Sequence, residues 1–235
     1  TDLHFVYFQM VETLFELIFA LQSIDDENLW YYLSFSDKNN YDKIKAISKG
    51  SNELFMDKIM LMNPKDKSKI KIPFLRYVFF HTIDLKKIGF SERKNLAITS
   101  KLLRKFAFDF TDRNEYNAFK HAMRLIYEKP RPKIETADKK HSFVFEGDNA
   151  FTYIKKYETD EHIGISVITK SFYPEIDIKL CMYCSWLIYN IIVTRKNHFY
   201  KTTESIMSYE TIDLDELEKM YAGLGRMEQH FYRDK

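Results

Sequence analysis

The chain has 235 residues, with 36 Lys and Arg against 34 Asp and Glu, so its net charge of +2 points to no class of partner. Glycine and proline are scarce, at 6 and 5 residues, and neither common glycine-rich nucleotide fingerprint occurs. This composition argues against phosphate-binding loops, β-sandwiches and propellers. Because 45% of the residues are apolar, the chain can bury a sizeable core.

The first half of the chain shows helical periodicity. The most apolar run begins near residue 3, but His4, Glu12 and Glu16 interrupt it, so we interpret it as a buried helix and predict no membrane span. Asp25 or Asp26 can cap the next helix, and Gly50 separates two later ones. A basic turn over residues 64–71 precedes the last of this group. The helices predicted here span residues 3–22, 29–33, 37–49, 52–62 and 73–84.

Two further helices follow, each with a capping residue. Ser91 is placed to cap a helix over residues 92–108, and Thr111 to cap one that runs from Asp112 to about Glu128. Asp112 and Glu115 lie in the first turn of the second helix, where the positive end of the helix dipole favours carboxylates. Pro130 and Pro132 then end it.

Residues 133–171 are different, because alternating and β-rich stretches replace the helical pattern. We predict strands at 141–145, 151–157 and 162–169, followed by a long helix from Pro174 to about Lys196. Asp213 or Asp215 opens a short final helix that ends by Gly223. The predicted fold is mainly α, a helical bundle with a small inserted antiparallel β-meander at about residues 133–171, and a single domain over residues 1–235.

Cys181 and Cys184 are the only cysteines, in the spacing C-x-x-C. They are either two small apolar core residues or part of a metal or redox site, for which His198 is the nearest candidate ligand. Two thiols without a disulfide framework suit a reducing cytoplasm. We therefore expect both to be reduced, metal-free and at least partly buried, in a cytoplasmic protein.

Charge is unevenly distributed along the chain. Residues 86–133 hold thirteen Lys or Arg against five Asp or Glu, a local charge of +8, while the rest of the chain is −6. A basic stretch beside aromatic residues is typical of surfaces that bind an anionic polymer such as RNA. It also fits an ordinary solvated face.

The predicted helix over residues 112–128 carries the most informative polar residues. At 100° per residue, a polar arc about 100° wide collects most of them, and nearly all of the remaining surface is apolar. Such an arc is either an ordinary solvent-exposed strip of the helix or a functional site. Neighbouring cations keep an imidazole neutral, so that His121 can accept a proton near neutral pH, while Arg113 can bind phosphate in a fork. The arc contains Arg113, Asn117, Lys120, His121, Arg124 and Glu128.

Arg113-Asn114 followed by His121 on a helix resembles the motif of HEPN-domain proteins, a helical superfamily rich in toxins and antiphage ribonucleases. Seven residues separate Arg113 from His121, one more than the usual motif has. The resemblance implies a metal-independent endoribonuclease without cofactors, working in bacterial defence or a toxin–antitoxin system, and a homodimer with facing motifs. Its catalytic residues would be Arg113, His121 and Asn117, and Lys120 and Arg124 would bind the RNA backbone.

Two alternatives stay open at this point. The first is a non-catalytic helical interaction or dimerisation module of the same fold, in which the polar arc binds a partner. The second is a metal-dependent nuclease, because Asp177-Ile178-Lys179 resembles an Asp-x-Lys signature. That chemistry needs carboxylates on paired strands, whereas here the first turn of a helix already explains the acidic residue.

Overall fold

The computed structural model describes residues 2–22, 38–62, 68–81, 83, 89–111, 115–118, 125–126, 133–135, 142–144, 150–222, 224 and 226–234. The chain forms two compact units. Unit 1 comprises residues 1–7, 112–180 and 213–235, and unit 2 comprises residues 8–111 and 181–212. Helices α1 and α8 begin in unit 1 and continue in unit 2. The prediction of one domain with a β insertion stays a prediction.

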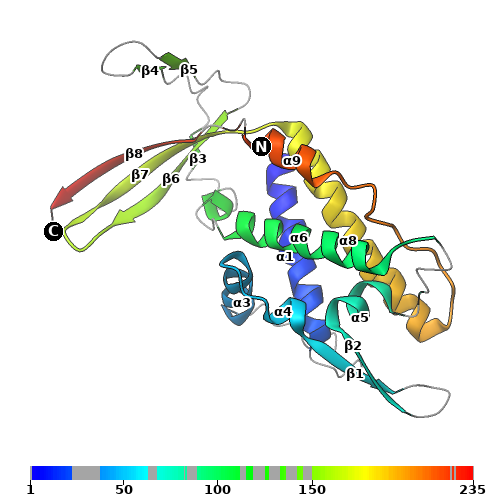
Figure 1. The fold of residues 1–235 in the computed structure, drawn as a ribbon. Coiled ribbons are helices and arrows are strands. Elements are labelled where there is room, and N and C mark those ends of the chain that lie inside the picture. The colour runs from blue at the N-terminus through cyan, green and yellow to red at the C-terminus, as the bar shows by residue number, and fades with distance from the viewer. Residues whose placement is uncertain are drawn as a thin grey trace. The chain divides into compact units, whose positions relative to one another are not determined.

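The mainly helical fold class with small antiparallel sheets is confirmed (Figure 1). Two predicted helix boundaries have clear local causes. Gly50 has φ +97°, and the N–H of Ser51 donates to the carbonyl of Ala46, which closes the helix before it. The Ser91 hydroxyl accepts from the Lys94 N–H at 3.3 Å, as expected for an N-cap. Among the described residues, the helices are α1 (Asp2–Gln22), α3 (Lys38–Ser48), α4 (Glu53–Met56), α5 (Phe74–Phe80), α6 (Glu92–Phe110), α8 (Pro174–Tyr200) and α9 (Leu214–Ala222).

The helix predicted over residues 52–62 is wrong beyond its first turn. After α4, the chain forms strand β1 (Lys58–Met62), which pairs with β2 (Lys69–Pro73) in an antiparallel hairpin. Ile59 is 3% exposed and its neighbour Met60 is 56% exposed, which is the two-residue period of a strand. The helix predicted over residues 29–33 lies outside the described residues.

The sheet of unit 1 has the strand order β3-β6-β7-β8 and is antiparallel throughout (Figure 1). Strands β6 (Ala150–Glu158) and β7 (His162–Ser171) form the predicted hairpin. The predicted strand at 141–145 appears as β5 (Ser142–Val144), but it pairs with β4 (Lys133–Glu135) in a separate hairpin. The third long strand of the sheet is β8 (Arg226–Asp234), from the other end of the sequence.

The core of unit 1 joins this sheet to a short helical turn at residues 115–118. Phe151, Tyr153 and Ile168 from the sheet pack with Ala118, and all four are buried. Phe5 of α1 lies against the same cluster and stacks on Tyr116. The turn that carries part of the predicted motif is therefore fixed by apolar contacts within its own unit.

Unit 2 buries polar side chains of α6 and α8 that bind an irregular segment of the chain. The Asn190 side chain accepts from the Met207 N–H and donates to the Met207 carbonyl, both at 2.8 Å. Asn197 makes the same pair of bonds to Glu204, both at 2.9 Å. Asn95 of α6 accepts from the Tyr209 N–H at 2.9 Å. The side chains of these three asparagines form hydrogen bonds with backbone groups that a neighbouring strand would otherwise pair with.

Helices α1 and α8 are long and apolar enough to cross a membrane by length and composition. Within the protein, 44% of the apolar window in α1 and 50% of that in α8 is buried. A core helix passes the same test, so these two helices do not by themselves indicate a membrane span.

Candidate functional site

The structure describes one of the five predicted site residues. Asn117 lies in the helical turn of residues 115–118 and is partly exposed, between the buried residues Tyr116 and Ala118. This alternation agrees with the predicted helical projection, in which Asn117 belongs to the polar arc and its two neighbours do not. The other predicted site residues lie outside the described residues; they are Arg113, Lys120, His121 and Arg124.

The predicted helix does not extend to Glu128, and this is a correction. Leu125 and Ile126 form strand β3, with Leu125 opposite Tyr153 and Ile126 opposite Thr152 of β6. Local propensity favours helix here only weakly, and pairing with the edge of an existing sheet outweighs it. The helix predicted from residue 112 to 128 therefore ends before Leu125, and Glu128 itself lies outside the described residues.

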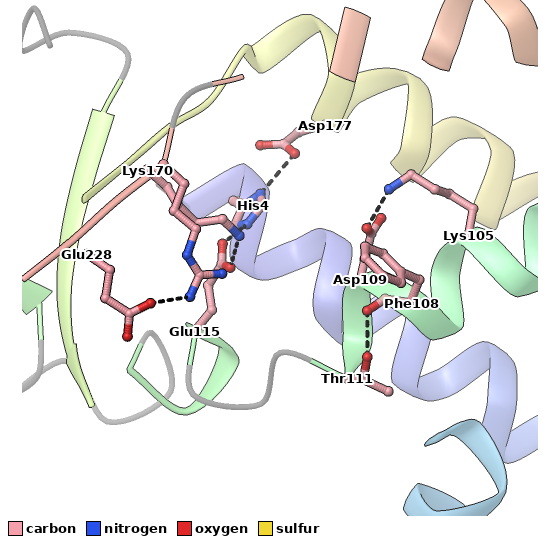
Figure 2. A network of polar contacts seen from close by, with 10 residues as sticks. His4, Lys105, Phe108, Asp109, Thr111, Glu115, Lys170, Asp177 and Glu228 are labelled. Atoms are coloured by element: carbon pink, nitrogen blue, oxygen red, sulfur yellow. Dashed lines mark hydrogen bonds and ion pairs between the residues drawn. The ribbon is translucent and has the colours of Figure 1, made fainter. Parts of the chain in front are cut away.

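A buried ionic network holds the turn of residues 115–118 in place (Figure 2). His4 of α1 is its centre: Nδ1 lies 2.9 Å from Asp177 Oδ1, and Nε2 lies 2.7 Å from Glu115 Oε1. The second oxygen of Glu115 accepts from the ammonium group of Lys170 on β7. Glu115 is 1% exposed and Asp177 is 4% exposed, so neither carboxylate is hydrated like a surface group.

The geometry of this network fixes its charge state. Each ring nitrogen of His4 faces a carboxylate oxygen, and only the imidazolium can donate from both nitrogens. Burial alone lowers the pKa of His4, but the hydrogen bonds to Asp177 and Glu115 outweigh burial and raise the pKa to about 9. For Glu115, burial acts to raise the pKa, and the contacts with His4 and Lys170 lower it overall. Two cations and two carboxylates therefore balance at neutral pH.

This arrangement is suited to holding structure together and not to acid–base chemistry. A general base needs a nitrogen with a free lone pair, and both nitrogens of His4 are engaged with carboxylates. The imidazole also stands between Glu115 and Asp177, so the carboxylates do not converge on a common point. No group of three or more potential metal ligands is found among the described residues.

Sequence reasoning missed this network. It treated His4 only as a polar interruption of an apolar run, and it explained Glu115 and Asp177 by the helix dipole. Asp177 does lie in the first turn of α8, as predicted, but its carboxylate contacts His4, 173 positions earlier in the chain. The one local signal is a histidine within a strongly apolar helix, and that signal does not identify the residues that the histidine contacts.

The two thiols agree with the predicted burial. Cys184 is buried, Cys181 is partly buried, and neither forms a disulfide. Burial, and then the neighbouring Cys181, raises the pKa of the Cys184 thiol, which keeps it protonated and unreactive at neutral pH. The absence of a bound metal stays a prediction.

Comparison with known proteins adds no assignment, since no protein-family model, no curated protein and no solved structure matches this chain. The resemblance to HEPN proteins therefore rests on the motif residues themselves.

Proposed function

We propose that this chain is a HEPN-like, metal-independent endoribonuclease of bacterial defence or a toxin–antitoxin system. The observation that supports the proposal best is the turn of residues 115–118: it is helical, and Asn117 is its partly exposed residue. In the helix predicted from the sequence, positions 113, 120 and 121 lie on the same side as position 117. That side of the predicted helix carries the residues to which we assign RNA cleavage.

The ionic network supports the same proposal in a second way. Glu115 is the only carboxylate in the turn, and it points inward to His4 and Lys170, which neutralise it. Its negative charge therefore does not oppose a phosphate on the outer side. A site also works best when its supporting turn is held rigidly, and here both ionic and apolar contacts hold it.

In the proposed reaction, neutral His121 removes the proton of a ribose 2′-hydroxyl as general base. The 2′-oxygen attacks the adjacent phosphorus, the bond to the 5′-oxygen breaks, and that oxygen takes a proton from water. His121 then returns the proton that it removed to the solvent. The products are a 2′,3′-cyclic phosphate and a 5′-hydroxyl end. Arg113 binds the phosphate and stabilises its developing charge, Asn117 orients the histidine, and Lys120 and Arg124 bind the RNA backbone.

The test is incubation of the chain with total RNA in EDTA. We expect His121→Ala to reduce cleavage about 10²–10⁴-fold while RNA binding is nearly unchanged, which is the usual scale for general acid–base catalysis. Arg113→Ala should weaken both cleavage and RNA binding. The affinity of the wild type for RNA should fall steeply with added salt. His162→Ala, a partly exposed histidine of β7, is the matched control and should cleave normally. A wild type that neither cleaves nor binds RNA at low salt would contradict the proposal.

One observation favours the alternative, a non-catalytic interaction module. Apolar side chains lie exposed along one side of α8, at spacings of three, four or seven residues, while its asparagines point inward. An exposed apolar row of this kind is typical of a surface that binds another protein. This function predicts no RNA cleavage by the wild type. The exposed residues are Ile178, Met182, Tyr189, Ile192 and Phe199.

A further inference from the structure

Helix α6 of unit 2 presents a continuous basic strip to the solvent. At about 100° per residue, its exposed and partly exposed cations fall within an arc of about 120°, which also contains position 108. The strip runs over about 22 Å of the helix axis, from position 93 to position 108. The other side of α6 carries buried residues such as Leu102, Leu103 and Phe106. The five cations of the strip are Arg93, Lys94, Lys101, Arg104 and Lys105.

The charge of this strip is not balanced within the helix. The sequence has no acidic residue between Glu92 and Asp109, at the two ends of α6. Glu92 forms an ion pair with Arg76 of α5 at 3.2 Å, and Asp109 accepts from Lys105 (Figure 2). A helix surface that only keeps a protein hydrated usually mixes acidic with basic residues, which form stabilising pairs three or four positions apart. Hydration alone therefore does not explain the composition of this strip.

Three of the five cations are not neutralised. Lys94 and Lys105 are paired with carboxylates. In the part of the chain that the structure describes, no carboxylate forms an ion pair with Arg93, Lys101 or Arg104. The Arg104 guanidinium is bonded to two neutral oxygens from the segment before α4, which fix its direction and leave its charge unopposed. These three side chains are available to an anionic ligand.

An exposed aromatic ring lies on the same strip. Phe108 is 66% exposed, and its helical position lies within about 20° of that of Lys101. A second ring, Phe55, lies beneath the Arg104 guanidinium, whose carbon is 4.2 Å from the ring centre. Cations next to aromatic rings are typical of surfaces that bind single-stranded nucleic acid, because the cations contact the phosphates and the rings stack on bases.

The strip fits a single strand better than it fits other anionic partners. In an RNA duplex the bases already stack on one another, so an exposed ring finds no base to stack on. Binding to an anionic membrane requires an apolar face beside the cations. The apolar face of α6 is buried in unit 2, and Phe108 is the one large apolar side chain that is exposed along this helix.

We propose that the outer strip of α6 binds single-stranded RNA. The three cations without carboxylate partners contact phosphates, and Phe108 stacks on a base. The choice of RNA over DNA rests on the proposed ribonuclease function, whereas the site itself rests on the contacts and the exposure of α6. None of these residues belongs to the predicted catalytic set, so the strip adds an RNA contact outside the motif.

The charges are tested by binding of a labelled 2′-O-methyl RNA single strand of about 12 nucleotides, which lacks the attacking hydroxyl and therefore stays intact. Replacing both Arg93 and Lys101 by Gln should weaken binding about tenfold at low salt. It should also reduce the slope of log affinity against log salt by about 1.4, since each phosphate contact on a single strand contributes about 0.7. Lys196→Gln is the matched control, because Glu204 already neutralises that ammonium group, and it should bind like the wild type. An unchanged affinity and slope in the double variant would overturn the proposal.

The ring is tested in the same assay. Phe108→Ala should weaken binding about tenfold and leave the salt slope unchanged, because a stacking contact releases no counterions. Phe199→Ala removes a ring of similar exposure, 52%, from α8 and should bind like the wild type. Equal losses in the two variants would overturn the proposal, as would tighter binding of duplex RNA or of phosphatidylserine vesicles than of the single strand.

Cleavage of total RNA, measured in parallel, separates this inference from the proposed function. If the wild type binds the single strand through α6 but cleaves no RNA, the ribonuclease proposal fails and the binding site stands. If the wild type cleaves RNA and the α6 variants bind and cleave equally well, the binding site is overturned and the ribonuclease proposal stands. We expect the α6 variants to cleave less at low RNA concentration and to approach the wild-type rate when RNA is saturating.

Discussion

In each of the two units, buried polar side chains bind segments that are far apart in the sequence. The chemical groups that make these contacts differ between the units. Unit 1 uses charged groups, with His4 between Asp177 and Glu115 and with Lys170 beside Glu115. Unit 2 uses neutral amides, as Asn190 and Asn197 bind the backbone of residues 204–207.

This difference has a physical consequence. Buried charges stabilise a fold only while each keeps its counter-charge, so a network of ions is sensitive to pH and to the loss of any member. An amide has no charge to lose in the range where proteins fold, and it provides both the donor and the acceptor that a peptide group needs. Stability should therefore depend on pH in unit 1 and be nearly independent of it in unit 2.

The largest expected effect comes from removing one charge of the ionic network. Glu115→Gln keeps the size of the side chain but removes the buried carboxylate that lies between the His4 imidazolium and the part-exposed Lys170 ammonium. It should lower the unfolding free energy of unit 1 by about 3–5 kcal/mol. Hydrogen exchange should show lost protection in β6 and β7. Glu216→Gln is the matched control, because its bond to Lys179 is solvent-exposed and should change stability by less than about 1 kcal/mol. Equal effects of the two variants would mean that the network does not stabilise unit 1.

The next effect is the pH dependence that His4 imposes. Its pKa rises from 6.5 to about 9 on folding, so the stability that comes from the protonated imidazole is complete below pH 6.5 and is lost as the pH rises through 9. The loss should total about 3 kcal/mol by pH 10. Urea unfolding followed at several pH values measures it. His4→Gln should be less stable at pH 6.5 and should lack this slope, and a slope that persists in the variant would assign it to other groups.

In unit 2 the sharpest test is Asn190→Ala. This change leaves the N–H and the carbonyl of Met207 without their side-chain partner and should cost about 2–3 kcal/mol. The cost should be the same at pH 6.5 and pH 9, in contrast to unit 1. Asn52→Ala, at an exposed position, serves as the control and should cost less than about 1 kcal/mol. If the cost of Asn190→Ala changes with pH, the contrast between the two units does not hold.

The smallest effect belongs to a local contact. Ser91→Ala removes the side-chain cap of α6 and should lower the unfolding free energy of unit 2 by about 1 kcal/mol. Ser91→Asp keeps an acceptor at the helix N-terminus and should restore most of that loss. If both variants are equally unstable, the hydroxyl contributes through something other than capping.

Elements whose ends are marked by nearby residues agree with the predictions from the sequence. Helices α3, α6, α8 and α9 were predicted close to their bounds because capping residues, Gly50 and Pro174 mark their ends locally. Strands β6 and β7 were predicted because β-rich residues and a polar turn adjoin in sequence. These elements carry their signals within about a dozen residues of themselves.

The segments whose secondary structure the sequence did not predict also share a cause. The segments at 58–62 and 125–126 are apolar enough for either helix or strand, and the neighbouring strands β2 and β6 decide in favour of strand. Strand β8 has mostly polar side chains and becomes a strand because β7 offers its free backbone groups. For the candidate site, the sequence placed Asn117 on a partly exposed helical side but did not reveal what holds that turn.

The sequence by itself therefore determined the helical class, the ends of the well-capped helices, the central hairpin and the residue types of the predicted arc, because each depends on neighbours along the chain. Only the tertiary structure decided that β8 completes the sheet and that His4 joins Glu115 to Asp177. Those contacts span 111 and 173 positions. A carboxylate at a helix start has the same local signature whether it faces water or a buried imidazolium, so the folded chain alone distinguishes the two.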